Sequence, residues 1–163
     1  KKPKGKNIKI VTTFDVASQD GFITRGAAIC AVTNILERYG HHVQIDAHIG
    51  SNDIVDTWIR VKETSWPVNY TDMAFFTAHP AMFYRVAYGC WEMLPSNVRS
   101  RMGWLGTKSW GWISEPRKDE RGDVYVSALG SSWCYSEKTM LKWVCEQLTK
   151  NGIEVDLSKV EGI

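Results

Sequence analysis

Three oxygen-bearing side chains follow an apolar, β-branched stretch near the start of the chain. Asp15 ends this stretch, which spans residues 6–15, and Ser18 and Asp20 come just before a segment with helical periodicity. Hard oxygen ligands between a strand and a helix suit Mg²⁺ or another divalent cation, and the helix N-terminus favours an anion. The sequence therefore predicts a metal site here, with Mg²⁺ as its expected ion. The alternative is that no metal binds and that Asp15 and Asp20 only cap the helix, which would stabilise it by about 1 kcal/mol.

A second set of candidate residues lies in an irregular segment, residues 94–122, which contains two prolines and four glycines. The candidates are its aromatic and basic side chains, Arg99, Arg101, Trp104, Lys108, Trp110 and Trp112. Such residues dominate the hot spots of protein interfaces, and they also stack on single-stranded nucleic acid and neutralise its phosphates. Three acids in the same segment, Glu115, Asp119 and Glu120, favour a protein partner over a nucleic acid. A further alternative is a covering loop whose tryptophans pack on the sheet.

The sequence motifs of an enzyme are weaker than the evidence for the two sites above. The chain contains neither a GxxxxGK[ST] phosphate loop nor a GxGxxG after its first predicted strand, and Gly130-Ser131-Ser132 does not match a GxSxG nucleophile elbow. The four histidines lack the spacing of metal ligands, and His79 precedes Pro80 at an expected helix start. An unrecognised hydrolase stays a third candidate, because a nucleophile and His79 would meet only in space.

Alternating strands and helices are expected to position these residues. The predicted strands cover residues 6–15, 42–49, 55–61, 109–113, 124–129 and 153–157. The predicted helices cover residues 21–39, 70–93 with an interruption at His79-Pro80, and 136–150. The apolar face expected for the second of these helices consists of Phe75, Met82, Val86, Cys90 and Met93. The short polar loop between the strands at 42–49 and 55–61 predicts a hairpin.

This alternation predicts an α/β fold: an open, mostly parallel, Rossmann-like sheet with one antiparallel edge strand and helices on both faces. With 163 residues, of which 44% are hydrophobic, the chain is sized for one core. We therefore expect a basic leader or linker over residues 1–6 and a single domain over residues 7–163. Ligands of such sheets bind at the carboxyl ends of the strands, so the first strand must be central for Asp15 to lie at a site.

The order of strand, acidic Ser-containing loop, long helix, hairpin and helix resembles a von Willebrand factor type A domain. The metal-dependent adhesion site of that family begins with Asp-x-Ser-x-Ser after the first strand. Asp15 matches this motif, whereas Ala17 and Gln19 stand at the positions of the two serines. Thr71 stands just before the predicted second helix, where the family has a later Thr ligand. The strand at residues 124–129 is not followed by the family's later Asp.

The resemblance implies a degenerate metal site made of Asp15, Ser18, Asp20 and Thr71. It also implies a role in adhesion or scaffolding, in which a partner's carboxylate completes the metal shell or a metal-free surface binds protein directly. Residues 25–31 and 36–40 are in addition similar to uncharacterised bacteriophage proteins, which suggests a phage-encoded domain acting on a host or viral protein.

Composition indicates the cellular compartment of the chain and the class of its partner. Its four cysteines show no CxxC or Cys/His pattern and fit a reducing compartment, and Cys30, Cys90 and Cys145 are expected to be buried and inert. No apolar run reaches the roughly 20 residues that span a bilayer, so we expect a cytoplasmic protein with no membrane partner. The net charge of +2 is too small to imply a polyanionic partner. A non-enzymatic protein-protein interaction or scaffolding domain is therefore the expected function, with nucleic-acid binding as the alternative.

Overall fold

The computed structural model describes residues 5–13, 19–51, 54–79, 85–86, 88–102, 113–127 and 137–153. Its strands are β1 (Asn7–Thr13), β2 (His42–Ser51), β3 (Val55–Lys62), β4 (Ile113–Ser114) and β5 (Val124–Val126). Its helices are α1 (Gln19–Arg38), α2 (Tyr70–Ala78), α3 (Tyr88–Glu92), α4 (Ser96–Arg101) and α5 (Glu137–Lys150), together with the 3-10 helix η2 (Lys118–Glu120).

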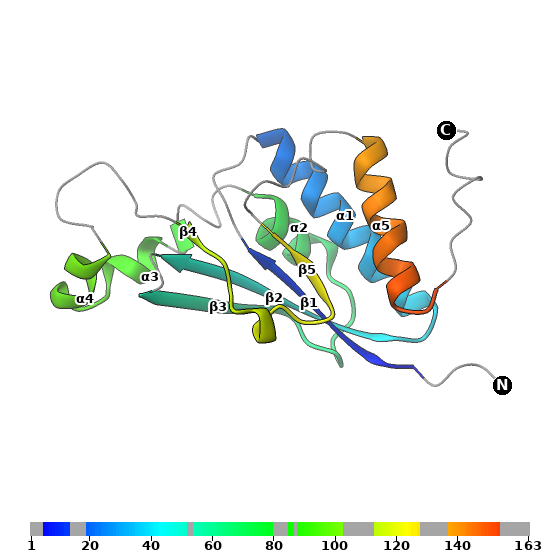
Figure 1. Ribbon diagram of the computed structural model, residues 1–163, viewed down its shortest axis with the longest axis horizontal. Helices are drawn as coiled ribbons and strands as arrows, with labels where there is room; N and C mark the ends of the chain where they lie inside the picture. Colours follow the sequence, from blue (N-terminus) through cyan, green and yellow to red (C-terminus); the bar gives the residue numbers. More distant parts are fainter. Residues whose placement is uncertain are drawn as a thin grey trace.

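The sheet has the strand order β3-β2-β1-β5 (Figure 1). Strand β1 pairs in parallel with both β2 and β5, whereas β2 and β3 form an antiparallel hairpin. The predicted open, mostly parallel sheet with one antiparallel strand at its edge is therefore confirmed. The first strand is central, as the prediction of a site at its carboxyl end requires.

The short strand β4 pairs with the carboxyl end of β2. Gly50 in β2 is opposite Ser114 of β4 and also opposite Asp56 of β3, so β3 and β4 flank β2 on its two sides. Strand β1 ends at Thr13, before this point. Strand β4 thus occupies the place beyond the end of β1 and brings the segment that follows it to the carboxyl edge of the sheet.

Three helices form one layer against the sheet. Helix α1 packs against both α2 and α5, and the three lie side by side in Figure 1. The buried strand side chains that share their hydrophobic core are Ile8, Ile10, Val43, Ile45, Ala47, Ile49, Val61, Val124 and Val126. The sequence predicts helices on both faces, but among the described residues these three helices cover one face, because α1 contacts both of the others.

The segment at residues 70–93 breaks at His79, as predicted, but the expected apolar face is not the one that is buried. The helices described in it are α2 and α3, whose buried residues include Met73, Tyr88 and Trp91. The expected apolar face was wrong for Phe75, Cys90 and Met93, which are all exposed, whereas Val86 is partly buried. Helix α2 ends at Ala78, so the positions that point inward before the break do not determine those that point inward after it.

The helix ends predicted at residues 39 and 150 agree with those of α1 and α5 to within one residue, and a glycine follows each. Gly40 after α1 and Gly152 after α5 have φ angles of +89° and +83°, in the left-handed region that favours glycine. Ile153 is buried, and the remainder of the strand predicted at residues 153–157 lies outside the described residues. Among the described helices, none combines the length and the apolarity needed to cross a membrane.

Candidate functional site

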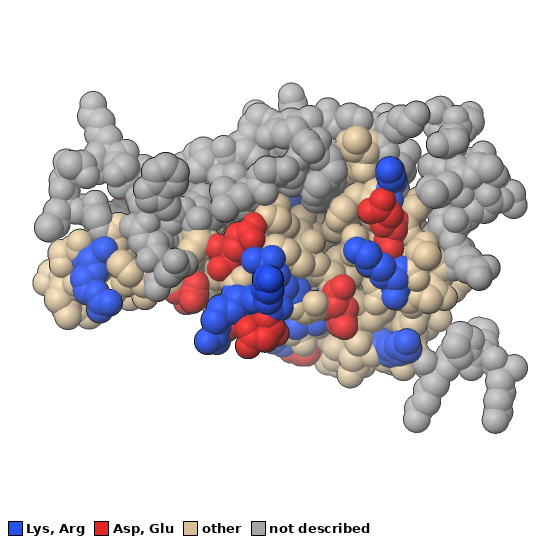
Figure 2. All heavy atoms as spheres, viewed as in Figure 1, with Lys and Arg blue, Asp and Glu red and all other residues tan. Residues whose placement is uncertain are grey.

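The face of the sheet opposite the helix layer carries polar side chains. Successive residues of a strand point to opposite faces, so Lys9 in β1 and Asp46 in β2 lie on this polar face while their neighbours enter the core. In the hairpin, Asp46 is opposite Arg60 and His48 is opposite Trp58. Figure 2 shows Lys and Arg side chains interleaved with Asp and Glu side chains near the centre of the view.

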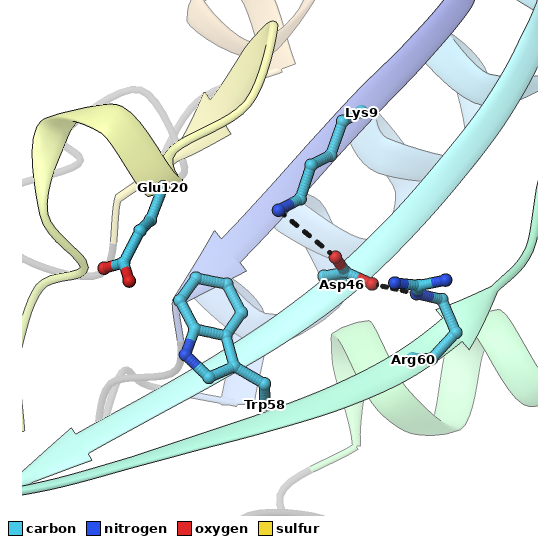
Figure 3. Close-up of a pocket in the computed structure, with 5 residues that line it drawn as sticks. All are labelled: Lys9, Asp46, Trp58, Arg60 and Glu120. Atoms are coloured by element: carbon cyan, nitrogen blue, oxygen red, sulfur yellow. Dashed lines mark hydrogen bonds and ion pairs between the residues drawn. The ribbon is translucent and has the colours of Figure 1, made fainter.

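A shallow, open pocket of about 350 Å³ lies on the polar face (Figure 3). We call it the Trp58 pocket. The side chains that line it are Lys9, Asp46, Trp58, Arg60 and Glu120. Three adjacent strands supply the first four, and η2 supplies Glu120 from the opposite wall. The pocket therefore depends on segments that are far apart in the sequence.

Asp46 is a buried carboxylate at the floor of this pocket. One of its oxygens accepts a hydrogen bond from Arg60 Nε. Its other oxygen accepts from Gln44 Nε2 at 2.9 Å and lies 3.4 Å from Lys9 Nζ. A buried carboxylate is costly unless it is paired and hydrogen-bonded, so these contacts hold Lys9 and Arg60 in place around it.

Trp58 provides an accessible aromatic wall. Its exposed fraction is 37%, although it stands in the middle of β3. Lys9 Nζ lies 5.3 Å from the centre of the Trp58 ring, within the range of a cation-π contact. The centroid of the His48 ring in β2 lies 4.7 Å from that of the Trp58 ring. Contacts with two neighbouring strands thus support the indole, which lowers the entropy cost of using it as an anchor.

The Glu120 side chain is held by Arg117, three residues before it, rather than by the other side chains of the pocket. Its two carboxylate oxygens accept from Arg117 Nη2 at 2.7 Å and from the Arg117 backbone N–H at 3.1 Å. These contacts lower the pKa of Glu120 and keep it ionised at neutral pH. The wall opposite Trp58 therefore carries a carboxylate whose charge is balanced by Arg117.

His48 and Asp56 connect the pocket with the carboxyl end of the sheet. The His48 ring is fully buried, and its Nε2 lies 2.9 Å from Asp56 Oδ1 across the hairpin. Its Nδ1 is buried without a hydrogen-bond partner among the described residues. Because the ring is buried and its Nε2 contacts Asp56, solvent does not reach this imidazole.

A second polar cluster, the strand-end cluster, surrounds the ends of β1 and β5. Its members are Thr13, Glu115, Arg121, Tyr125 and Ser127. Thr13 Oγ1 and the Tyr125 hydroxyl lie 3.1 Å apart, while Glu115 accepts from Ser127 Oγ and from Arg121 Nη2. Partial burial raises the pKa of Tyr125, so its hydroxyl stays protonated at neutral pH. This network joins the segment after β4 to the carboxyl edge.

The predicted metal ligands are only partly described. Asp15 and Ser18 lie outside the described residues, and the backbone of Asp20 is in the first turn of α1. Thr71 is exposed in the first turn of α2, where its N–H donates to the capping side chain of Asn69. Within the described ranges, no group of three or more His, Cys, Asp or Glu side chains could hold a metal ion. The Mg²⁺ site stays a prediction.

The predicted partner-binding residues are likewise divided. Arg99 and Arg101 lie in the last turn of α4, and Arg101 is exposed. Trp104, Lys108, Trp110 and Trp112 lie outside the described residues. The structure therefore places two members of this set on one short helix and does not test whether the six residues form one surface.

The residues of the Trp58 pocket were missed by the sequence analysis. A signal was present in the second hairpin strand, where Asp56, Trp58 and Arg60 alternate with Thr57 and Ile59. This period of two marks one polar and one buried face, and a large aromatic on the polar face is unusual. Their grouping with Lys9 and Glu120 depends on tertiary structure.

The geometry defines an α/β domain with a helix layer on one face of its sheet and a mixed-charge pocket on the other. The chain belongs to the DUF7192 family, described as a domain of unknown function, whose family model matches residues 4–155. Neither the curated proteins nor the solved structures provide a match.

Proposed function

We propose that this chain is a non-enzymatic protein-interaction domain that binds its partner through the Trp58 pocket. The observation that carries the proposal is an exposed tryptophan that contacts Lys9 and lines one pocket with Arg60 and the buried carboxylate of Asp46. Tryptophan and arginine are the residues most enriched in the hot spots of protein interfaces. An anchor whose position is already fixed loses little conformational entropy on binding.

The pattern of charge favours a protein over a nucleic acid. Lys9 and Arg60 each contact Asp46, and Arg60 also pairs with Glu63. Glu120 adds a further carboxylate, which is paired with Arg117. Nucleic-acid binding depends on cations that neutralise successive phosphates, whereas here acids alternate with the bases. Arg99 and Arg101 on α4 are the described residues on which the nucleic-acid alternative rests.

The buried histidine offers little support for a hydrolase. A general base must come within hydrogen-bonding reach of the proton that it removes from a substrate or a nucleophile. His48 is fully buried and its Nε2 contacts Asp56, so a role in holding the hairpin explains it better. His79 lies at the C-terminus of α2 and stacks on Phe75.

The proposed likeness to von Willebrand factor type A domains rests on the order of the elements. The central strand β1, the long helix α1, the β2-β3 hairpin and helix α2 follow in the order that suggested the resemblance. Thr71 lies in the first turn of α2, as the resemblance would require. A role in adhesion or scaffolding, on a host or viral protein, is the function that we propose on this basis.

Affinity isolation with matched tryptophan variants tests the proposal. Wild-type chain, Trp58→Ala and Trp66→Ala are used as baits in nuclease-treated extract of the source cells, and captured proteins are quantified by mass spectrometry. Trp66 is exposed but does not line the pocket, so it controls for the loss of a surface aromatic. We expect a protein that is captured by wild type and Trp66→Ala and reduced about tenfold on Trp58→Ala. Equal capture by all three baits contradicts the proposal.

A further inference from the structure

The hydrogen-bonding capacity of the Trp58 pocket indicates which chemical group it binds. This inference rests on the proposed function, because it takes the pocket as the contact site. Both carboxylates of the pocket already have donors: Asp46 accepts from Arg60 and Gln44, and Glu120 accepts twice from Arg117. A ligand that donates a hydrogen bond to either carboxylate would therefore add little to the free energy of binding.

The donors of the pocket are less fully used. The ammonium of Lys9 has three N–H groups that can donate. Among the described residues it forms an ion pair with Asp46, at 3.4 Å. Arg60 donates through Nε to Asp46 and through Nη1 to Glu63, which leaves its Nη2 without a described partner. The side chains of Lys9 and Arg60 are 37% and 40% exposed, so a ligand can reach both.

We propose that the pocket binds an acidic side chain of the protein partner. Its carboxylate would accept from Lys9 Nζ and Arg60 Nη2, and its methylene groups would lie on the Trp58 ring. Hydrogen bonds between ionised groups are roughly twice as strong as neutral ones, and Arg is suited to carboxylates because of its planar fork. The ligand is an isolated acid rather than a polyanion, because Glu120 and Glu63 border the two cations.

A peptide titration followed by NMR tests this inference. The probe is the blocked peptide acetyl-Ala-Leu-Glu-Leu-Ala-amide, and its counterpart carries Gln in place of Glu. The Trp58 indole N–H signal, assigned with Trp58→Phe, reports binding. We expect saturable shifts of this signal with the Glu peptide, and binding of the Gln peptide at least about tenfold weaker, as for a lost charge pair.

Variants of the two cations locate the binding. Lys9→Met and Arg60→Gln should each weaken the Glu peptide about fivefold, whereas Lys142→Gln, an exposed charge on α5, should leave its affinity unchanged. An equal effect of all three variants would mean that only net charge is sensed, and it would overturn the inference.

A gain of affinity provides a second, independent test, since Lys9→Met or Arg60→Gln leaves Asp46 under-compensated and can disturb folding. Asp46→Asn removes the internal carboxylate that competes for both cations, and the Gln44 contact can be kept. We expect the Glu peptide to bind this variant about three- to tenfold more tightly than wild type. Unchanged or weaker binding by folded Asp46→Asn overturns the inference.

The class of ligand is tested by competition with an oligonucleotide of thymidines. Displacement of the Glu peptide by the oligonucleotide, abolished in Lys9→Met, would assign the pocket to nucleic acid and overturn the inference. The proposed function fails separately. If the partner captured from extract is lost on Trp58→Ala but kept by Lys9→Met and Arg60→Gln, protein binding stands and the acidic ligand is rejected.

Discussion

Lys62 and Glu37 form an ion pair of 2.6 Å that joins the edge strand β3 to the last turns of α1. The Lys62 side chain is only 2% exposed, and its ammonium also donates to the backbone oxygens of Val43 and Glu63. An inward-pointing lysine on an edge strand disfavours pairing with another chain, because a further strand would have to accommodate its charge. This contact fixes the hairpin to the helix layer. It thereby also fixes the strand that carries Trp58 on the opposite face of the sheet.

Removing the acid of this pair should destabilise the fold more than removing the base. Glu37→Ala leaves a buried ammonium without its counter-charge, and we expect a loss of about 2 kcal/mol in the free energy of unfolding. Lys62→Met replaces the charge with an apolar chain of similar length, while Glu37 can be hydrated, and should cost about 1 kcal/mol. Denaturant unfolding measures both values. The reverse ranking would show that the pair does not stabilise the hairpin.

Gly122 should be among the positions least tolerant of a side chain. Its φ is +69°, and a Cβ there would lie 2.6 Å from the backbone oxygen of Lys9. The adjacent Asp123 exchanges two hydrogen bonds with Lys9, so this turn sets the register of β5 against β1. We expect Gly122→Ala to lower the free energy of unfolding by about 3 kcal/mol.

Gly152→Ala is the matched control, because Gly152 also has a positive φ, whereas a Cβ added there would meet no described atom within 4 Å. Its expected cost is about 1 kcal/mol, from backbone conformation alone. If thermal unfolding gave equal losses for the two alanine variants, the close approach of Gly122 to β1 would have no energetic role.

The cysteines should differ in reactivity towards a thiol reagent. Burial, partial for Cys30 and nearly complete for Cys145, raises the pKa of both thiols, so a smaller fraction of each is thiolate at neutral pH, and it also restricts access. Cys90 is exposed on α3, contrary to its prediction as a buried thiol. In a Cys134→Ser background, we expect Cys90 to react with Ellman's reagent at least about tenfold faster than the other two.

The matched variant for this measurement is Cys90→Ser in the same background. It should lack the fast phase and keep two slow thiols that react fully only in denaturant. A fast phase that persists without Cys90 would contradict the burial assigned to Cys30 and Cys145.

The mixed pairing of the sheet, mostly parallel with one antiparallel edge strand, was predictable because local patterns determine most of it. The β-branched run before Asp15, the alternation in the hairpin and the helix between them require a parallel neighbour and an antiparallel edge. Helix ends at Gly40 and Gly152 were predictable from backbone sterics. The break at His79 was also predictable, from Pro80, but the buried face of residues 70–93 was not, because a break changes which side chains point inward.

The candidate site was harder to predict than the fold. Asp46 and Arg60 meet because of the hairpin register, which contains an irregularity between Ile45 and Asp46. A shift of one residue would have sent one of them into the core. Glu120 reaches the pocket from a 3-10 helix in a segment with no periodic pattern, so its position follows from tertiary packing alone.

The most direct test of protein binding through the Trp58 pocket is site-specific photo-crosslinking. Purified chain with benzoylphenylalanine at position 58 or, as the control, at position 66 is irradiated in extract of the source cells. We predict a discrete protein adduct from position 58 that survives nuclease treatment and is absent from position 66. Adducts from position 66 alone, or an adduct from position 58 that nuclease removes, would contradict the account.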